Sequence, residues 1–127
     1  MPETSPWIAI VDDDPSVLRA LSRLLRTRAL SVKTFPSGQQ FLNFLNDEMP
    51  DCLILDLQMP GMTGLELQQD LARRGIQIPT IVITAHNEAE TRERCASAGA
   101  IAFLPKPIDD ASLFAAIELA RQRRRRH

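Results

Sequence analysis

Residues 51–64 read DCLILDLQMPGMTG and place a carboxylate, Asp56, between an apolar run and a turn. The run 52–55 is typical of a buried strand, and the turn-forming stretch 59–61 follows shortly after it. Burying a charge at the end of a strand costs free energy unless the charge is paired, hydrogen-bonded or bound to a ligand. Asp56 is therefore the first candidate for a functional residue.

Three other apolar runs in the chain also end in polar residues. These are Asp12, Asp13 and Asp14 after residues 7–11, Thr84 after residues 81–83, and Lys106 after residues 100–104. In an open α/β sheet the carboxyl ends of parallel strands meet at one edge, where ligands bind. The sequence thus predicts that acids, a hydroxyl and an ammonium share this edge.

Helix-period segments separate the apolar runs. Strands are predicted over residues 7–12, 30–35, 51–56, 79–84 and 100–104. The helices between and after them are expected to begin after the N-caps Asp14, Ser37 and Thr63, with Gln40 and Glu66 completing capping boxes, and then to cover 88–98 and 109–123. The third helix is expected to end near Gly75.

Five strand–helix units of this kind predict an α/β fold. Runs that are apolar throughout favour a parallel sheet that is covered by helices on both faces. We expect a five-stranded, doubly wound sheet with strand order 2-1-3-4-5, of the flavodoxin-like or CheY-like type. Residues 1–120 are interpreted as one domain, and 121–127 as an arginine-rich helix end or linker.

Composition limits the function classes. Of the fifteen Lys and Arg residues, five lie within 121–126, so residues 1–120 carry ten bases against sixteen acids. An acidic domain argues against nucleic acid as its own ligand. The chain has no apolar run that could span a bilayer and no signal-peptide pattern at its start, so we expect a cytoplasmic location without membrane contact. Cys52 and Cys95 show no metal-ligand spacing and are expected to be inert thiols.

The predicted cluster of acids suits a divalent metal and a phosphoryl group. Asp12, Asp13 and Asp56 cannot all be ionised within a few ångströms without a cation, and hard oxygen ligands suit Mg²⁺ or Mn²⁺. With the repulsion removed, Asp56 is a plausible nucleophile that forms an aspartyl phosphate. Lys106 and Thr84 are the expected partners of the phosphoryl oxygens. Only two lysines occur in the chain, which indicates that a compact ammonium is wanted at 106.

Two other function classes fit the same fold. A haloacid-dehalogenase-type phosphatase needs a second Asp two residues after the nucleophile as general acid, but Gln58 stands there. A flavin or nucleotide binder needs a phosphate-cradling loop after the first strand, where residues 12–14 are acidic. Neither class fits the residues as well as phosphoryl transfer to Asp56.

The chain resembles the receiver domain of two-component response regulators, and within that family the FixJ-like subclass. The resemblance covers essentially residues 7–120. The motifs that carry it are Ile10-Val11-Asp12-Asp13-Asp14, residues 55–64, Val82-Ile83-Thr84-Ala85-His86 and Leu104-Pro105-Lys106-Pro107. An intact set of acids, Thr and Lys argues against a pseudo-receiver that only binds partners.

The resemblance implies a role for each site residue. Asp56 is the implied phosphoacceptor, Asp13 a direct metal ligand, Asp12 a metal contact largely through water, and Gln58 a ligand through its backbone carbonyl. Thr84 and Lys106 contact the phosphoryl group, and the Lys106–Pro107 bond is expected to be cis. Such a domain is a phosphoacceptor with Mg²⁺-dependent self-phosphorylation and slow dephosphorylation rather than an enzyme.

Three further side chains have implied switching or tuning roles. Phe103 stands at the switch position, where an aromatic ring reports by packing whether Thr84 has moved inward. Gln58 and His86 lie two residues beyond site residues, at positions that affect how long the acyl phosphate survives. His86 either controls the hydrolytic water or is a solvent-facing loop residue.

The implied partners are those of a signalling switch. A histidine kinase is expected to donate the phosphoryl group, and phosphorylation is expected to favour a homodimer through the helix 4–strand 5–helix 5 face. DNA contact is expected only through a transcription output domain that is absent from these 127 residues. The alternative is a stand-alone receiver that acts by protein–protein interaction.

Overall fold

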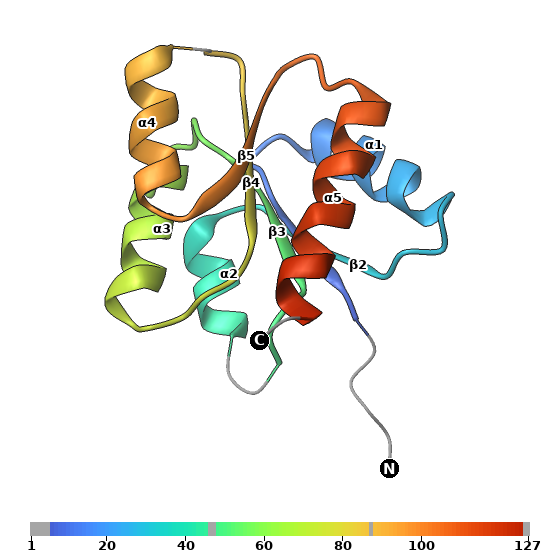
Figure 1. The fold of residues 1–127 in the computed structure, drawn as a ribbon, viewed down its shortest axis with the longest axis horizontal. Coiled ribbons are helices and arrows are strands. Elements are labelled where there is room, and N and C mark those ends of the chain that lie inside the picture. The colour runs from blue at the N-terminus through green and yellow to red at the C-terminus, as the bar shows by residue number, and fades with distance from the viewer. Residues whose placement is uncertain (1–5, 46–47, 87, 126–127) are drawn as a thin grey trace.

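The computed structural model describes residues 6–45, 48–86 and 88–125, in which strands and helices alternate along the chain (Figure 1). The strands are β1 (Ile8–Val11), β2 (Val32–Phe35), β3 (Cys52–Asp56), β4 (Thr80–Thr84) and β5 (Ala100–Pro105). The helices are α1 (Pro15–Arg26), α2 (Gly38–Phe44), α3 (Gly64–Arg73), α4 (Ala89–Ser97) and α5 (Asp110–Arg125). The alternation confirms the predicted α/β class.

The five strands form one sheet in the order β2-β1-β3-β4-β5, and every pairing is parallel. Val11 pairs with Leu55, and Asp56 pairs with Ile83, so the ends of three strands are level with one another. The interior strands β1, β3 and β4 are buried along their whole length, whereas the edge strands β2 and β5 are partly exposed. The predicted strand order is therefore confirmed.

Helices cover both faces of the sheet. α1 and α5 lie on one face, where Leu25 and Leu113 pack against Ile54 and Ile83. α2 and α3 lie on the other face and bury Phe41 in the second main cluster. α4 packs on the α3 side through a smaller cluster (Figure 1). Because helices cover both faces of the sheet, strands in its interior are apolar throughout, and the apolar runs therefore predicted the strands correctly.

The helix starts follow the predicted capping residues with one difference. The Asp14 side chain accepts a hydrogen bond from the backbone N–H of Ser16, two residues on, and the Ser37 side chain accepts one from that of Gln40, three residues on. At Thr63 the capping box with Glu66 is complete in both directions. At Ser37 only one half of the box is among the described hydrogen bonds, because Gln40 contributes its backbone N–H but not its side chain. The side chain cap is sufficient to start the helix.

The last helix differs from the sequence prediction. We expected the helix to cover residues 109–123, but α5 continues to Arg125. Arg121 and Arg124 are half-buried, and Arg124 Nε lies 3.9 Å from Asp51 Oδ1. Arginine has a long apolar stem, which can be covered at a protein surface while its charged head stays accessible to a partner or to solvent. Residues 126 and 127, which belong to the same expected helix end or linker, lie outside the described residues.

The two cysteines lie in apolar surroundings. Cys52 and Cys95 are both buried and unbonded to each other. Burial raises the pKa of each thiol, which keeps it protonated. Among the described residues no helix is both long and apolar enough to cross a lipid bilayer.

Candidate functional site

The candidate site lies where four strands end. Asp12 directly follows β1, Asp56 and Thr84 close β3 and β4, and Lys106 directly follows β5. The ladder continues past these ends, since the N–H of Leu57 donates to the Ile83 carbonyl at 3.0 Å. This register brings the predicted polar side chains to one edge of the sheet.

Lys106 joins the two buried acids. Its Nζ lies 3.3 Å from Asp12 Oδ2 and 3.2 Å from Asp56 Oδ1. Asp12 is fully buried and Asp56 is 3% exposed, whereas the lysine side chain is 27% exposed. The second oxygen of Asp12 accepts a hydrogen bond from the backbone N–H of Asp14 at 2.9 Å. Asp12 is therefore held in place from two directions.

The negative charge of Asp56 is only partly compensated by the ammonium of Lys106 beside it. The pKa of Asp56 is raised to about 6, first by burial and then by the nearby carboxylates of Asp12 and Asp13, while Lys106 opposes the rise. Burial lowers the pKa of Lys106, but its contacts with Asp56 and Asp12 outweigh this and raise the pKa overall. The lysine stays protonated and does not fully neutralise the pair of acids beside it.

Asp12, Asp13 and Asp56 together fit a hard divalent cation. Each offers a carboxylate oxygen, and these oxygens lie within 4.8 Å of one another. Carboxylate oxygens are the ligands that Mg²⁺ prefers, and Mn²⁺ accepts the same set. Burial is the main cause of the raised pKa of Asp56, and a cation at these oxygens would remove the second cause, the repulsion by Asp12.

The Lys106–Pro107 peptide bond is cis, as expected. The backbone N–H of Lys106 donates to the Thr84 carbonyl at 2.7 Å, which extends the pairing of β4 with β5 by one residue. Lys106 thus starts from a fixed backbone position next to Thr84. Its side chain spans the sheet edge toward β1 and β3.

Thr84 is buried at the end of β4, and its hydroxyl oxygen accepts a hydrogen bond from the backbone N–H of His86 at 3.0 Å. The hydroxyl hydrogen remains available as a donor. The side chains of His86 and Gln58 are exposed. The structure therefore places both predicted tuning residues at the surface beside the site, and their roles remain predictions.

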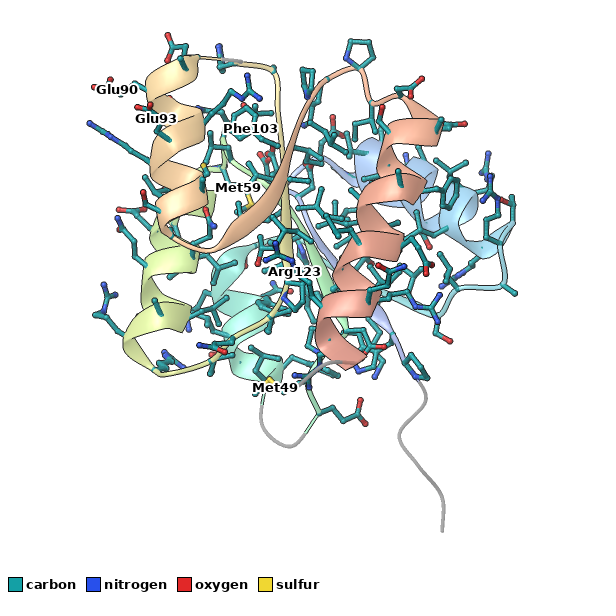
Figure 2. All side chains as sticks on the ribbon, viewed as in Figure 1. Met49, Met59, Glu90, Glu93, Phe103 and Arg123 are labelled. Carbon is teal, nitrogen blue, oxygen red and sulfur yellow. The ribbon has the colours of Figure 1, made fainter. Side chains whose placement is uncertain are left out.

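Phe103 is half-buried in β5 and lies on the α4 side of the sheet (Figure 2). It packs against the small cluster of Leu57, Val82 and Cys95. The guanidinium carbon of Arg92 in α4 lies 5.6 Å from the centre of its ring, at the outer limit of a cation–π contact. With no hydroxyl to bond, the ring is positioned by these contacts alone.

Gly64 supports the site in a way that the sequence analysis did not single out. A Cβ atom at this position would lie 2.5 Å from the Asp56 carbonyl oxygen and 2.9 Å from Leu57 Cα. Its N–H donates to the Leu57 carbonyl at 3.0 Å. Only glycine lets α3 begin this close to the chain that carries Asp56. The signal was a glycine in the first turn of a predicted helix, where it is otherwise unfavourable.

The sequence of the chain was compared with protein families and with known proteins. Residues 8–118 match the family model of the response regulator receiver domain. The chain is 42% identical over 120 residues to the response regulator protein TodT of Pseudomonas putida, which covers 94% of this chain and 53% of TodT. It is 38% identical over 117 residues to the transcriptional regulatory protein FixJ of Rhizobium meliloti, covering 92% and 57%. The chain thus spans about half the length of these curated relatives.

Solved structures show the same architecture. The response regulator StyR superposes with a TM-score of 0.90 at 40% identity, covering 97% of this chain and 62% of StyR. FixJ-N superposes with a TM-score of 0.86 at 36% identity, covering 94% of this chain and 96% of FixJ-N. The fold and the sequence comparisons therefore agree.

Proposed function

The chain belongs to the response regulator receiver domain family, and on this basis we propose that it is a phosphorylation-dependent switch of a two-component system. Asp56 is the proposed phosphoacceptor and a histidine kinase the proposed donor. The observation that carries the proposal is the contact of one ammonium, that of Lys106, with both Asp12 and Asp56 at 3.3 and 3.2 Å. A cation-binding set of acids around one reactive carboxylate suits acceptance of a phosphoryl group.

In the proposed reaction a carboxylate oxygen of Asp56 attacks the phosphorus atom of a phosphohistidine. The new P–O bond forms as the P–N bond breaks, and the electron pair leaves with the imidazole. Lys106 holds a positive charge beside the incoming oxygens, and the Thr84 hydroxyl donates a hydrogen bond to one of them. Asp12, Asp13, Asp56 and the backbone carbonyl of Gln58 would hold Mg²⁺, which supplies charge neutralisation when bound.

The phosphorylated state is proposed to act through the side of the domain next to Thr84. Inward movement of Thr84 changes the space open to the Phe103 ring, and with it the face formed by α4, β5 and α5. This face is the proposed site of homodimerisation. Gln58 and His86 are proposed to tune the lifetime of the aspartyl phosphate.

The proposed output is control of transcription. Relatives such as FixJ carry the name of transcriptional regulators, and this chain matches about half of their length. We therefore place DNA contact in an output domain outside these 127 residues, in a cytoplasmic protein. A stand-alone receiver that acts through protein contacts is the alternative.

Acetyl phosphate provides the direct test of the proposal without a cognate kinase. With Mg²⁺ the domain should gain one phosphoryl group, detected by intact mass, and the gain should be lost when EDTA removes the metal. Labelling that persists unchanged in EDTA would contradict the proposed role of the three acids.

Lys106→Arg should impair phosphorylation although the charge is kept. The planar guanidinium is longer than the ammonium and cannot contact Asp12 and Asp56 from the same point. We expect labelling by acetyl phosphate to be slowed roughly tenfold, the factor that corresponds to about 1.4 kcal/mol of lost transition-state stabilisation. Lys33→Arg is the matched control, because Lys33 lies on β2 and pairs with Glu48. Wild-type rates in both variants would show that Lys106 is only a strand-end charge.

The arginine-rich end should contribute no specific DNA binding of its own. Five arginines within 121–126 attract duplex DNA weakly, without sequence preference and with a steep salt dependence. Fluorescence anisotropy with a labelled duplex should therefore show binding at low salt that vanishes by physiological salt. Sequence-selective binding at that salt, lost on trimming after Ala120, would instead make this segment an output element.

A further inference from the structure

Helix α4 is weakly attached to the domain by its own residues. Cys95 is its one buried side chain, in a helix whose nine residues the structure describes in full. Figure 2 shows Glu90 and Glu93 on the outer side of this helix, away from the sheet. Its N-cap residue, Glu88, accepts no side-chain hydrogen bond from a backbone N–H of the first turn, unlike the caps of α1, α2 and α3, although its carboxylate accepts one from the Thr91 hydroxyl at 3.5 Å. Something outside α4 must therefore help to hold it.

Gln68 of α3 supplies that attachment. Its side chain is 2% exposed, and its Nε2 donates to the Cys95 carbonyl at 3.1 Å. Cys95 lies in the last turn of α4, where carbonyls lack the usual partner four residues on. The same oxygen otherwise accepts only the N–H of Ala98, at 3.1 Å, among the described hydrogen bonds. The amide of Gln68 thus caps α4 from the neighbouring helix.

Packing alone does not explain a glutamine at this position. Its Oε1 is buried and has no hydrogen-bond partner among the described residues. Rotating the amide would place an oxygen against the Cys95 carbonyl, so the donor must face Cys95. A buried acceptor without a partner costs free energy that an apolar side chain would not. Gln68 is therefore distinguished by the hydrogen bond that it donates to α4.

Cys95 connects this hydrogen bond to the site. Its side chain packs with Leu57 and Val82, and Phe103 lies against the same cluster. Leu57 directly follows Asp56, and Val82 lies two residues before Thr84. Cys95, whose carbonyl accepts from Gln68, therefore packs against the residue that follows Asp56 and against a residue of β4 two positions before Thr84.

We propose that Gln68 is a positioning residue that sets how readily α4 leaves its place against Leu57, Val82 and Phe103. The inference rests on the proposed function in one respect: the helix that it holds belongs to the face through which the phosphorylated domain is proposed to act. Breaking the Gln68–Cys95 hydrogen bond loosens α4 without touching any residue that accepts or binds phosphate.

Hydrogen exchange of Gln68→Met tests this proposal. Methionine keeps the length of the side chain and removes both the donor and the unpartnered oxygen. Amides of α4 should exchange roughly threefold to tenfold faster, as expected for one lost hydrogen bond. Amides of α1 and α5 should be unchanged. Gln69→Met is the matched control, because Gln69 is the next residue of the same helix and is exposed.

The same measurement after labelling with acetyl phosphate and Mg²⁺ separates positioning from simple packing. In the wild type, phosphorylation should speed exchange in α4, and in Gln68→Met it should add little to exchange that is already fast. Equal exchange of α4 in Gln68→Met and Gln69→Met would overturn the proposal, even if Asp56 is labelled. Failure of wild-type labelling would instead refute the proposed function, while the comparison of unlabelled variants would still decide the role of Gln68.

Gln68→Glu allows the hydrogen bond to the Cys95 carbonyl to be restored or removed by changing the pH of a single variant. A protonated Glu can donate to the Cys95 carbonyl as Gln does, whereas the carboxylate cannot, and burial favours the protonated form. Exchange in α4, taken relative to Gln69→Glu at each pH, should be slow at low pH and fast at high pH. A ratio that does not change with pH would contradict a donor role.

Discussion

Asp56→Asn is expected to take up no phosphoryl group from acetyl phosphate and Mg²⁺. The substitution removes the carboxylate oxygen that attacks phosphorus and leaves Asp12, Asp13, Thr84 and Lys106 in place. An amide is a poor nucleophile, so the loss should be complete rather than partial. Intact mass and retardation on a phosphate-binding gel measure it.

Two variants make this result specific. Asp51→Asn makes the same change one residue before β3 (Cys52–Asp56), at the opposite end of the strand, and should be labelled like the wild type. Asp13→Asn keeps the acceptor but removes one oxygen from the acid cluster, so it should need more Mg²⁺ for the same labelling. Undiminished labelling of Asp56→Asn would move the acceptor to another residue.

The sheet and the site edge could be predicted because local patterns determined them. Strands buried on both faces read as continuous apolar runs, and polar residues at their ends must share an edge once the strands are parallel. The caps Asp14 and Thr63 were recognisable for a similar reason, since a cap bonds to backbone within three residues.

The features that were missed depend on contacts between distant segments. Gln68 reads as the first of three consecutive polar residues in a helix, and only the structure shows its amide on Cys95, 27 residues away. Gly64 matters because the backbone after Asp56 passes too close for a Cβ. The packing of Arg124 near Asp51 was likewise invisible in a run of arginines. The helix and strand periods of a sequence do not indicate contacts between residues that lie far apart along the chain.

Asp56→Asn should also stabilise the metal-free domain at neutral pH. The pKa of Asp56 is raised from 3.8 to about 6 by burial and by Asp12, so the folded state binds this proton more tightly than the unfolded state. The free energy of unfolding of the wild type therefore falls as the pH rises through about 6. Asparagine keeps the shape and carries no charge; the pKa rise corresponds to at most about 3 kcal/mol, which solvent screening reduces to an expected gain of about 2 kcal/mol above that pH.

Urea unfolding in EDTA measures this gain, followed by the fluorescence of Trp7, the single tryptophan, which is 4% exposed. The gain of Asp56→Asn over the wild type should be largest at pH 7.5, should shrink as the pH falls below about 6, and should approach zero only below pH 3.8, where the Asp56 carboxyl is neutral in both states. Mg²⁺ should reduce the gain at pH 7.5, because the wild type binds the cation more tightly and is stabilised by it. Asp51→Asn should show neither dependence. An equal gain at both pH values would mean that side-chain packing, not the buried charge, separates the two proteins.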